Sequence, residues 1–401
     1  MFKTWVPVAF SRDAPTNLEA GFIDGQIKLM GLPRPAENTR PTWEIFLQAQ
    51  FIRPIERLWR QGAPTVILAF DDYSLVPKAK SITQAARRAR LTPIEFEETD
   101  SLPDFPPDPW APAMVNRIFK AKVQQLVIEA LPRLLEAKEG SVLIVDWKGP
   151  VVSKIEWMPC GTIKVSEMPR EPVGEADIKF ARWAKQLNVP MGAEATDGDF
   201  VPIALMSTAR NLWVLRNEAN PTKTDPLKHH EWVNVDLLRK GLIDCMGYKQ
   251  QTILPMIALI AITGTDFSRG LPYVGPRRLV KILGIFSTTR RALGEGGCID
   301  PEPTLNSLVS LIYASLYRAH VDEGPFKDVI CRLTTTPSLS KRLREKLPSE
   351  SQALTTLRNA NFLFKYWAAD EPEAPDSMIK GLYGFRMGER GKVEWDDDTS
   401  D

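Results

Sequence analysis

The chain contains the stretch Thr65-Val66-Ile67-Leu68-Ala69-Phe70-Asp71, a short apolar run that ends in an acid. Two more runs have the same form, Gly21-Phe22-Ile23-Asp24 and Ser141-Val142-Leu143-Ile144-Val145-Asp146. Strands buried on both faces of a parallel sheet read as continuous apolar runs. Ligands of open α/β sheets bind beyond the carboxyl ends of such strands. The sequence therefore predicts an α/β fold whose mainly parallel central sheet carries acids at one edge.

Helical periodicity fills much of the sequence between these runs. The expected helices span Trp43 to Arg60, Met114 to Ala137, Ala176 to Leu187 and Val235 to Met246. Residues 93–112 hold six prolines, and the stretch from Glu95 to Asp108 holds six acids and no base. Such a composition predicts a long loop or a disordered insertion.

Composition excludes several classes of protein. The 401 residues suffice for two or three domains, or for one large α/β domain with insertions. Four dispersed cysteines and three histidines form no zinc-binding pattern, so carboxylates are left as the expected chemistry. The longest apolar run, Ile253 to Ile262, is too short to span a bilayer. We therefore expect a soluble, intracellular protein with no membrane partner.

Two further segments each place two acids one residue apart. Glu175 and Asp177 open a helical pattern, and Asp197 and Asp199 follow an expected strand. Carboxylates at a strand end or in a first helical turn can bind one ion or two adjacent ions, and Mg²⁺ prefers oxygen ligands. Two ions about 3.5 to 4 Å apart would activate a water and stabilise the leaving oxygen of a phosphodiester. These segments indicate a metal-dependent hydrolase of phosphodiesters.

A basic turn follows the acid pairs. The segment Gly264-Thr265-Asp266-Phe267 leads to a turn bounded by Gly270 and Gly275. From Phe267 to Gly294 the chain has no acid and six bases, Arg269, Arg277, Arg278, Lys281, Arg290 and Arg291. A glycine-bearing turn between helices can present backbone N–H groups to phosphates without reading bases. The pattern predicts contacts to a nucleic-acid backbone.

Taken in chain order, the segments F-I-D-G, F-D-D, G-E-A-D, T-D-G-D and G-T-D-F and the glycine-bearing turn resemble the flap endonuclease and XPG-type 5′ nucleases. The resemblance covers residues 20–285 and is dense from 172 to 285. It implies a PIN-like three-layer core over residues 1–345. That core would carry an arch-like insertion at about residues 78–130 and a duplex-binding helix-turn-helix, or helix-hairpin-helix, at about residues 264–291. Residues 346–401 would form a C-terminal extension with an acidic tail. The C-terminal part of the chain would be mostly helical.

The resemblance also implies the residues of the site. Two Mg²⁺ or Mn²⁺ ions would be held directly or through water by seven acids, Asp24, Asp71, Glu175, Asp177, Asp197, Asp199 and Asp266. Lys78 follows Asp71 at the spacing of the family's catalytic lysine. The expected catalytic residues are Lys78, Glu175, Asp197 and Asp199. The expected nucleic-acid contacts are Arg87, Arg88, Arg269, Gly270, Gly275, Arg277, Arg278 and Lys281.

The function that the resemblance implies is hydrolysis of phosphodiester bonds in DNA, at flaps or at junctions of single strand and duplex. Two alternatives stay open. The segments G-E-A-D-I-K and G-T-D-F are also similar to those of the 5′ to 3′ exoribonucleases, so an RNA-directed exonuclease or endoribonuclease would use the same core. A scaffold derived from a nuclease would keep the fold with weak or lost catalysis. All three readings expect a nucleic-acid partner. DNA is favoured, and RNA is the alternative.

The net charge fits a nucleic-acid partner once it is divided by region. The whole chain has a formal charge of +1, from 51 bases and 50 acids. Residues 368–401 contribute ten acids and four bases, so the remaining 47 bases and 40 acids leave a charge of +7. An acidic tail therefore masks a basic body, and attraction to phosphates is expected from that body.

Overall fold

The computed structural model describes residues 2–33, 40–76, 80, 90–169, 173–195, 197–217, 230–246, 260–265, 270–272, 274, 301–310, 312–313, 325–335, 340–368, 385–387 and 393–395. The chain forms two compact units. The first, here called the sheet unit, comprises Val6–Val76 and Ala85–Gly241. The second, the helical unit, comprises Met1–Trp5, Pro77–Gln84 and Leu242–Asp401. The expected boundary between residues 345 and 346 stays a prediction.

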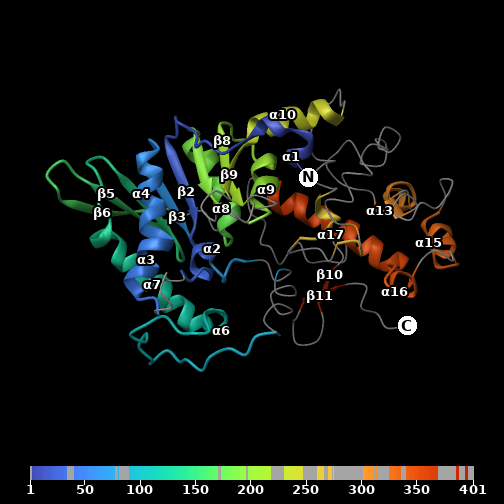
Figure 1. Cartoon of the computed structure of the whole chain (residues 1–401), viewed down its shortest axis with the longest axis horizontal. Helices are drawn as coiled ribbons and strands as arrows, with labels where there is room; N and C mark the ends of the chain where they lie inside the picture. The colour runs from blue at the N-terminus through green and yellow to red at the C-terminus, as the bar shows by residue number, and fades with distance from the viewer. Residues whose placement is uncertain are drawn as a thin grey trace. The chain divides into compact units, whose positions relative to one another are not determined.

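Within the described residues, the sheet unit is built on one sheet with the strand order β1-β9-β8-β7-β2-β3-β4-β5-β6 (Figure 1). Its strands are β1 (Phe10–Ser11), β2 (Ala20–Asp24), β3 (Thr65–Ala69), β4 (Val142–Asp146), β5 (Val151–Trp157), β6 (Ile163–Pro169), β7 (Met191–Glu194), β8 (Leu212–Asn217) and β9 (His230–Asn234). Strands β8, β7, β2, β3 and β4 run parallel, whereas β9 with β1 and β5 with β6 add antiparallel pairs at the two ends. The predicted α/β class with a parallel centre is confirmed.

The three apolar runs of the sequence are the central strands. All five residues of β2 are buried, and so are four of the five in β3 and in β4. Asp24 is in register with Ala69, and Ala69 is in register with Asp146. The carboxyl ends of β2, β3 and β4 therefore lie at one edge of the sheet, and that edge positions the candidate site.

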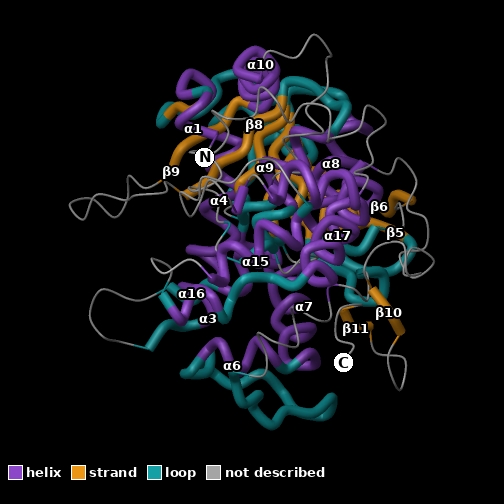
Figure 2. The backbone as a smooth tube through the Cα atoms, turned by 90° about the vertical axis from the view of Figure 1, so that its right-hand side faces the viewer, coloured by secondary structure: helices purple, strands orange, loops and turns teal. Residues whose placement is uncertain are grey.

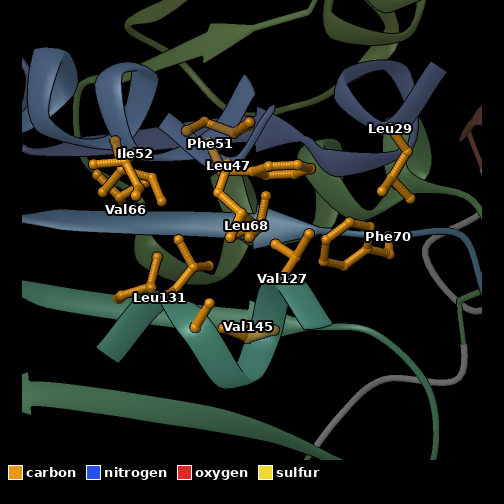
Figure 3. Packing of buried hydrophobic residues seen from close by; sticks show 14 of the residues in the cluster. Leu29, Leu47, Phe51, Ile52, Val66, Leu68, Phe70, Val127, Leu131 and Val145 are labelled. Carbon is orange, nitrogen blue, oxygen red and sulfur yellow. The ribbon is translucent and has the colours of Figure 1, made fainter. Parts of the chain in front are cut away.

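One face of the sheet is covered by helices from two parts of the chain. They are α2 (Gly25–Met30), α3 (Trp43–Leu47), the π-helical η2 (Gln48–Ile52), α4 (Arg53–Arg60), α6 (Trp110–Val115) and α7 (Arg117–Leu134). Figure 3 shows Val66, Leu68 and Phe70 of the β3 segment packed between side chains of η2 and α7. The chain is helical throughout Trp43–Arg60, as predicted. The helix changes from π to α geometry next to Pro54. Proline has no backbone N–H, so it cannot donate a hydrogen bond within the helix.

The other face carries α8 (Ala176–Leu187) and α9 (Phe200–Met206). Phe22 of β2 meets Phe180 and Phe200 with ring centroids 5.3 and 6.2 Å apart, respectively. The bounds of α8 are those predicted, and so are those of α10 (Val235–Met246). The sheet thus lies between two layers of helices.

Residues 91–109 form a long loop that packs onto the sheet unit. Ile94, Phe96 and Leu102 contact the hydrophobic cluster around β3. The side-chain amide of Asn116, the N-cap of α7, donates to the carbonyl oxygens of Ile94 (3.2 Å) and Phe96 (3.1 Å). Of the two expectations for this stretch, the long loop is confirmed. Residues 94–130, which belong to the expected arch-like insertion, therefore contribute contacts to the core.

Replacing Asn116 by alanine is expected to lower the free energy of unfolding by about 2 kcal/mol. The Asn116 Oδ1 also accepts from the N–H groups of Ile118 and Phe119, both at 3.0 Å, so the substitution removes the cap of α7 and the loop's anchor together. Asn116→Ser keeps a cap acceptor and loses only the anchor, so its loss should be smaller. Urea denaturation of both variants measures the difference; equal losses would contradict a capping contribution.

The helical unit contains α1 (Phe2–Trp5), α13 (Pro301–Thr304), the π-helical η4 (Leu305–Val309), α15 (Phe326–Thr335), α16 (Lys341–Arg344) and α17 (Glu350–Ala368). The strands β10 (Phe385–Met387) and β11 (Val393–Trp395) form an antiparallel pair, which Figure 2 shows in orange. The 3₁₀-helix η1 (Pro7–Ala9), which follows α1 in the sequence, belongs to the sheet unit. Among the helices of the described residues, none combines the length and the apolar character needed to cross a bilayer.

Candidate metal centre at the carboxyl edge of the sheet

Three of the predicted metal-binding acids end or follow a parallel strand, namely Asp24 for β2, Asp71 for β3 and Asp197 for β7. Asp24 is the most buried of the three. It ends β2, is 5% exposed, and caps α2 by accepting from the N–H groups of Gln26 (2.9 Å) and Ile27 (3.1 Å). Its pKa is raised to about 7, first because burial removes the carboxylate from water and then because Asp71 and Asp197 add negative charge. The two backbone hydrogen bonds oppose this rise. The structure therefore brings Asp24, Asp71 and Asp197 into one electrostatic group.

Asp71 connects β3 to the start of α8. Its Oδ1 accepts from the N–H of Ala176 (3.0 Å), and the N–H of the next residue, Asp72, donates to the carbonyl oxygen of Gly174 (2.6 Å). Gly174 has no room for a side chain, because a Cβ there would lie 2.5 Å from the carbonyl carbon of Leu75. This close backbone approach holds Glu175, which is 1% exposed, beside the segment that carries Asp71.

The remaining described acids come from the first turn of α8 and the loop after β7. Asp177 lies in the first turn of α8 and is partly buried. Asp197 follows the end of β7 by three residues and is exposed, and its Oδ1 accepts from the N–H of Asp199 at 3.3 Å. Asp199 is the residue before α9. Acids from β2, from the β3 segment and from the loop after β7 thus gather at the carboxyl edge, beside the start of α8.

The donor set suits a hard divalent cation. Within the described residues, Asp24, Asp71 and Asp197 form no ion pair, so a cation would relieve their mutual repulsion. Carboxylate oxygens are the ligands preferred by Mg²⁺, which also keeps several waters. In the described parts of the chain, no three His, Cys, Asp or Glu side chains are close enough together to hold one ion.

Several predicted residues lie outside the described part of the chain. They are Asp266, Lys78, Arg87, Arg88, Arg269, Gly275, Arg277, Arg278 and Lys281. Of the predicted turn, Gly270 is described and has a φ of +70°, a conformation that favours glycine. A Cβ on Gly270 would lie 2.6 Å from the backbone nitrogen of Gly264, so the two glycines let the chain approach itself closely.

Two strand-end acids at the same edge have structural partners instead. Asp146, which ends β4, is 2.7 Å from the Lys179 ammonium and accepts from the Trp183 indole N–H at 2.9 Å. Glu194, which ends β7 and is 1% exposed, accepts two hydrogen bonds from Arg57, at 2.7 and 2.6 Å, and one from Lys28 at 3.3 Å. These cations neutralise both carboxylates, so the two acids stand apart from the group around Asp24.

Lys179 is a residue of this edge that the sequence reasoning missed. It is 2% exposed, and its ammonium donates to the carbonyl oxygens of Phe70 (2.7 Å), Asp146 (3.2 Å) and Trp147 (3.0 Å). These bonds fix the chain beyond β3 immediately before Asp71. The available signal was a lysine one turn into α8, on the same helical face as Glu175 and Ile178, where an apolar residue is the usual choice.

No protein-family model matches the chain, and no curated protein matches its sequence. Among solved structures, the chain is similar to the catalytic core of Rad2 in complex with a DNA substrate. That match has a TM-score of 0.43 and 14% identity, and it covers 93% of this chain and 87% of the other. The chain is also similar to the T5 D15 protein co-crystallised with metal ions. Here the TM-score is 0.37 and the identity 12%, with 90% of this chain and 98% of the other covered.

Proposed function

We propose that the chain is a divalent-metal-dependent nuclease of the flap endonuclease and XPG type, which hydrolyses phosphodiester bonds in DNA at flaps or at junctions of single strand and duplex. The observation that carries the proposal is the group formed by Asp24, Asp71 and Asp197 at the carboxyl edge of parallel strands. Burial, and then the charges of Asp71 and Asp197, raise the pKa of Asp24 to about 7. An uncompensated group of carboxylates destabilises the fold, so a bound cation is its natural complement.

The acids share one role in this proposal, which is to bind the metal ions. Asp24, Asp71, Glu175, Asp177, Asp197 and Asp199 hold two Mg²⁺ or Mn²⁺ ions directly or through water, with Asp266 as the seventh ligand. When bound, the ions supply the activation of a water molecule and the stabilisation of the leaving oxygen. The backbone bonds of Asp24 to Gln26 and Ile27 and of Asp71 to Ala176 orient these carboxylates before any ion arrives. Such preorganisation reduces the cost of assembling the site.

The basic residues complete the proposal. Lys78 would stabilise negative charge on the scissile phosphate. Arg269, Gly270, Gly275, Arg277, Arg278 and Lys281, with Arg87 and Arg88, would contact the phosphate backbone, so that recognition depends on shape and charge rather than on base sequence. Consistent with this, binding should weaken as the salt concentration rises.

The double variant Asp71→Asn and Asp197→Asn tests the metal site. Both substitutions keep the shape of the side chain, and the amide oxygen introduced at position 71 can still accept from the N–H of Ala176, so the fold should be retained. With Mg²⁺ or Mn²⁺ and a 5′-flap DNA substrate, we expect the cleavage rate to fall about 100-fold or more. Asp13→Asn, an exposed acid of the same unit, is the matched control and should cleave at the wild-type rate.

The same assay separates the alternatives. Retained cleavage by the double variant would contradict the metal-site assignment. Cleavage of matched RNA but not of DNA by the wild type would favour the RNA-directed nuclease. A wild type that cleaves neither and whose melting temperature is unchanged by millimolar Mg²⁺ or Mn²⁺ would favour the scaffold.

A further inference from the structure

Strand β6 leaves a long edge of the sheet open. Among the described strands, the sheet ends in β1 on one side and in β6 on the other. The strand β1 has two residues, whereas β6 pairs with β5 along all seven of its residues without a bulge. Figure 1 shows this hairpin at the left end of the sheet, beyond α4. The free backbone groups of a long, regular edge are a ready template for another strand.

The hydrogen bonds of β5 show which backbone groups of β6 are free. The Trp157 N–H donates to the carbonyl oxygen of Ser141 at 3.1 Å, and the Trp157 carbonyl oxygen accepts from the N–H of Gly140 at 2.9 Å. The backbone of Trp157 is therefore directed toward β4, and its opposite residue on β6, Ile163, is directed away from β5. These directions alternate along a strand. The residues whose N–H and C=O groups lie on the open side are Ile163, Val165 and Glu167.

Apolar side chains follow the same edge. Val165 is 63% exposed and Ile163 is 41% exposed. They are in register with Ile155 and Trp157, which belong to the buried hydrophobic cluster around β3. Residues in register share a face of the sheet, so the apolar row of the core continues across β5 and ends on β6. A further strand at this edge would remove the end of the row from water.

A second copy of the chain fits this edge, because the edge is complementary to itself. Two β6 strands related by a two-fold axis normal to the sheet run antiparallel and keep each residue on its own face. If the axis passes between Val165 and Val165 of the second copy, the free groups of Ile163 meet those of Glu167, and all of them are paired. Lys164 then lies opposite Ser166 of the second copy, so no charge opposes its like.

Other positions of the axis are less favourable. An axis at Lys164 or at Glu167 would place like charges directly opposite each other. An axis at Ser166 would place Pro169, which has no N–H, opposite Ile163 and would leave Val165 facing the Glu167 carboxylate. The valine-centred register alone joins the two exposed valines and pairs every free N–H group.

We propose that the chain forms a two-fold symmetric dimer in which β6 pairs antiparallel with β6 of a second copy, centred on Val165. The axis reverses the strand direction, so the two candidate metal centres lie at opposite edges of the joined sheet. The dimer is therefore independent of the proposed function. One pair of strands is a small interface, so the expected dissociation constant is on the order of 10 µM.

Sedimentation equilibrium of the full chain between about 1 and 100 µM tests the dimer and should show a change from monomer to dimer. Val165→Lys places two ammonium groups opposite each other at the axis and should raise the dissociation constant about tenfold or more. Its melting temperature should match that of the wild type, because the side chain is exposed in the monomer. Val8→Lys changes another exposed valine of the sheet unit in the same way and should dimerise like the wild type.

Cysteine cross-linking tests the register. Val165→Cys brings two thiols together across the axis at a Cα separation of about 5.5 Å, which a disulfide can span. Mild oxidation should give a covalent dimer faster than with Ser166→Cys, whose two copies lie about 7 to 8 Å apart on a diagonal. Val8→Cys should give none.

Three results would overturn the dimer. They are a wild type that stays monomeric at about 100 µM, a Val165→Lys variant with the wild-type dissociation constant, and a Val8→Lys variant that fails to dimerise. Faster cross-linking at position 166 than at position 165 would overturn the valine-centred register.

Discussion

Replacing Asp24 by asparagine is expected to raise the free energy of unfolding of the metal-free protein by about 2 to 4 kcal/mol at pH 8. The asparagine Oδ1 can still accept from the N–H groups of Gln26 and Ile27, so the cap of α2 is kept. What is lost is a buried negative charge beside Asp71 and Asp197. A stabilising substitution at a buried, hydrogen-bonded position is unusual, and it is the result expected where a fold keeps a group for binding rather than for stability.

The effect depends on pH in a defined direction. The pKa of Asp24 is raised from 3.8 to about 7, mainly by burial and then by the charges of Asp71 and Asp197. Between these two values the folded protein holds a proton that the unfolded chain has released, so stability falls as the pH rises through this window. Below about pH 4 both states are protonated, and above about pH 7 the penalty is complete. The gain from Asp24→Asn should therefore be largest at pH 8 and close to zero at pH 4.

Urea denaturation in EDTA across this pH range measures the prediction, and Asp146→Asn is the matched control. Asp146 ends the parallel strand β4 as Asp24 ends β2, but it is paired with Lys179. Its neutralisation should destabilise the protein, because it leaves the buried ammonium without its counter-charge. Millimolar Mg²⁺ should stabilise the wild type more than Asp24→Asn and so narrow the gap between them. A destabilised Asp24→Asn variant at pH 8 would contradict our interpretation of the acid group.

Replacing Lys179 by methionine is expected to lower the free energy of unfolding by about 3 to 5 kcal/mol. The substitution leaves the buried Asp146 carboxylate without its counter-ion and removes a donor from the carbonyl oxygens of Phe70, Asp146 and Trp147. Of these, the Asp146 oxygen still accepts from the N–H of Phe70 at 2.8 Å. One of these carbonyls belongs to Phe70, directly before Asp71, so the position of the Asp71 carboxylate depends on Lys179. The proposed nuclease activity should fall together with stability.

The double variant Lys179→Met and Asp146→Leu tests the cause of that loss. The double variant has no uncompensated carboxylate, and apolar replacement of a whole buried ion pair is often neutral. More than half of the free energy of unfolding lost in Lys179→Met should therefore be recovered. The melting temperatures of the two variants measure the recovery. If Lys179→Met alone unfolds at the wild-type temperature, the ammonium does not stabilise the ends of β3 and β4.

Local patterns predicted much of the fold. The apolar runs that end in Asp24, Asp71 and Asp146 became β2, β3 and β4, and the helical periods gave α8 and α10 with the bounds that the structure has. Burial and periodicity are properties of neighbouring residues, so a sequence alone contains them. The sequence could not show whether residues 91–109 are an ordered loop or a disordered insertion. The order of this loop depends on Asn116 and on a hydrophobic cluster formed by distant segments.

The sequence by itself determined that acids would stand at the carboxyl edge of a parallel sheet. Only the tertiary structure decided which of them form the candidate site. In the sequence, Asp146 and Glu194 resemble Asp24, because each ends a short apolar run. In the structure, Lys179 neutralises Asp146. Glu194 is neutralised by Arg57 and Lys28. These partners lie 33 to 166 residues away along the chain. A carboxylate's charge is balanced or left unbalanced by its neighbours in space, and those neighbours are set by how the helices pack on the sheet.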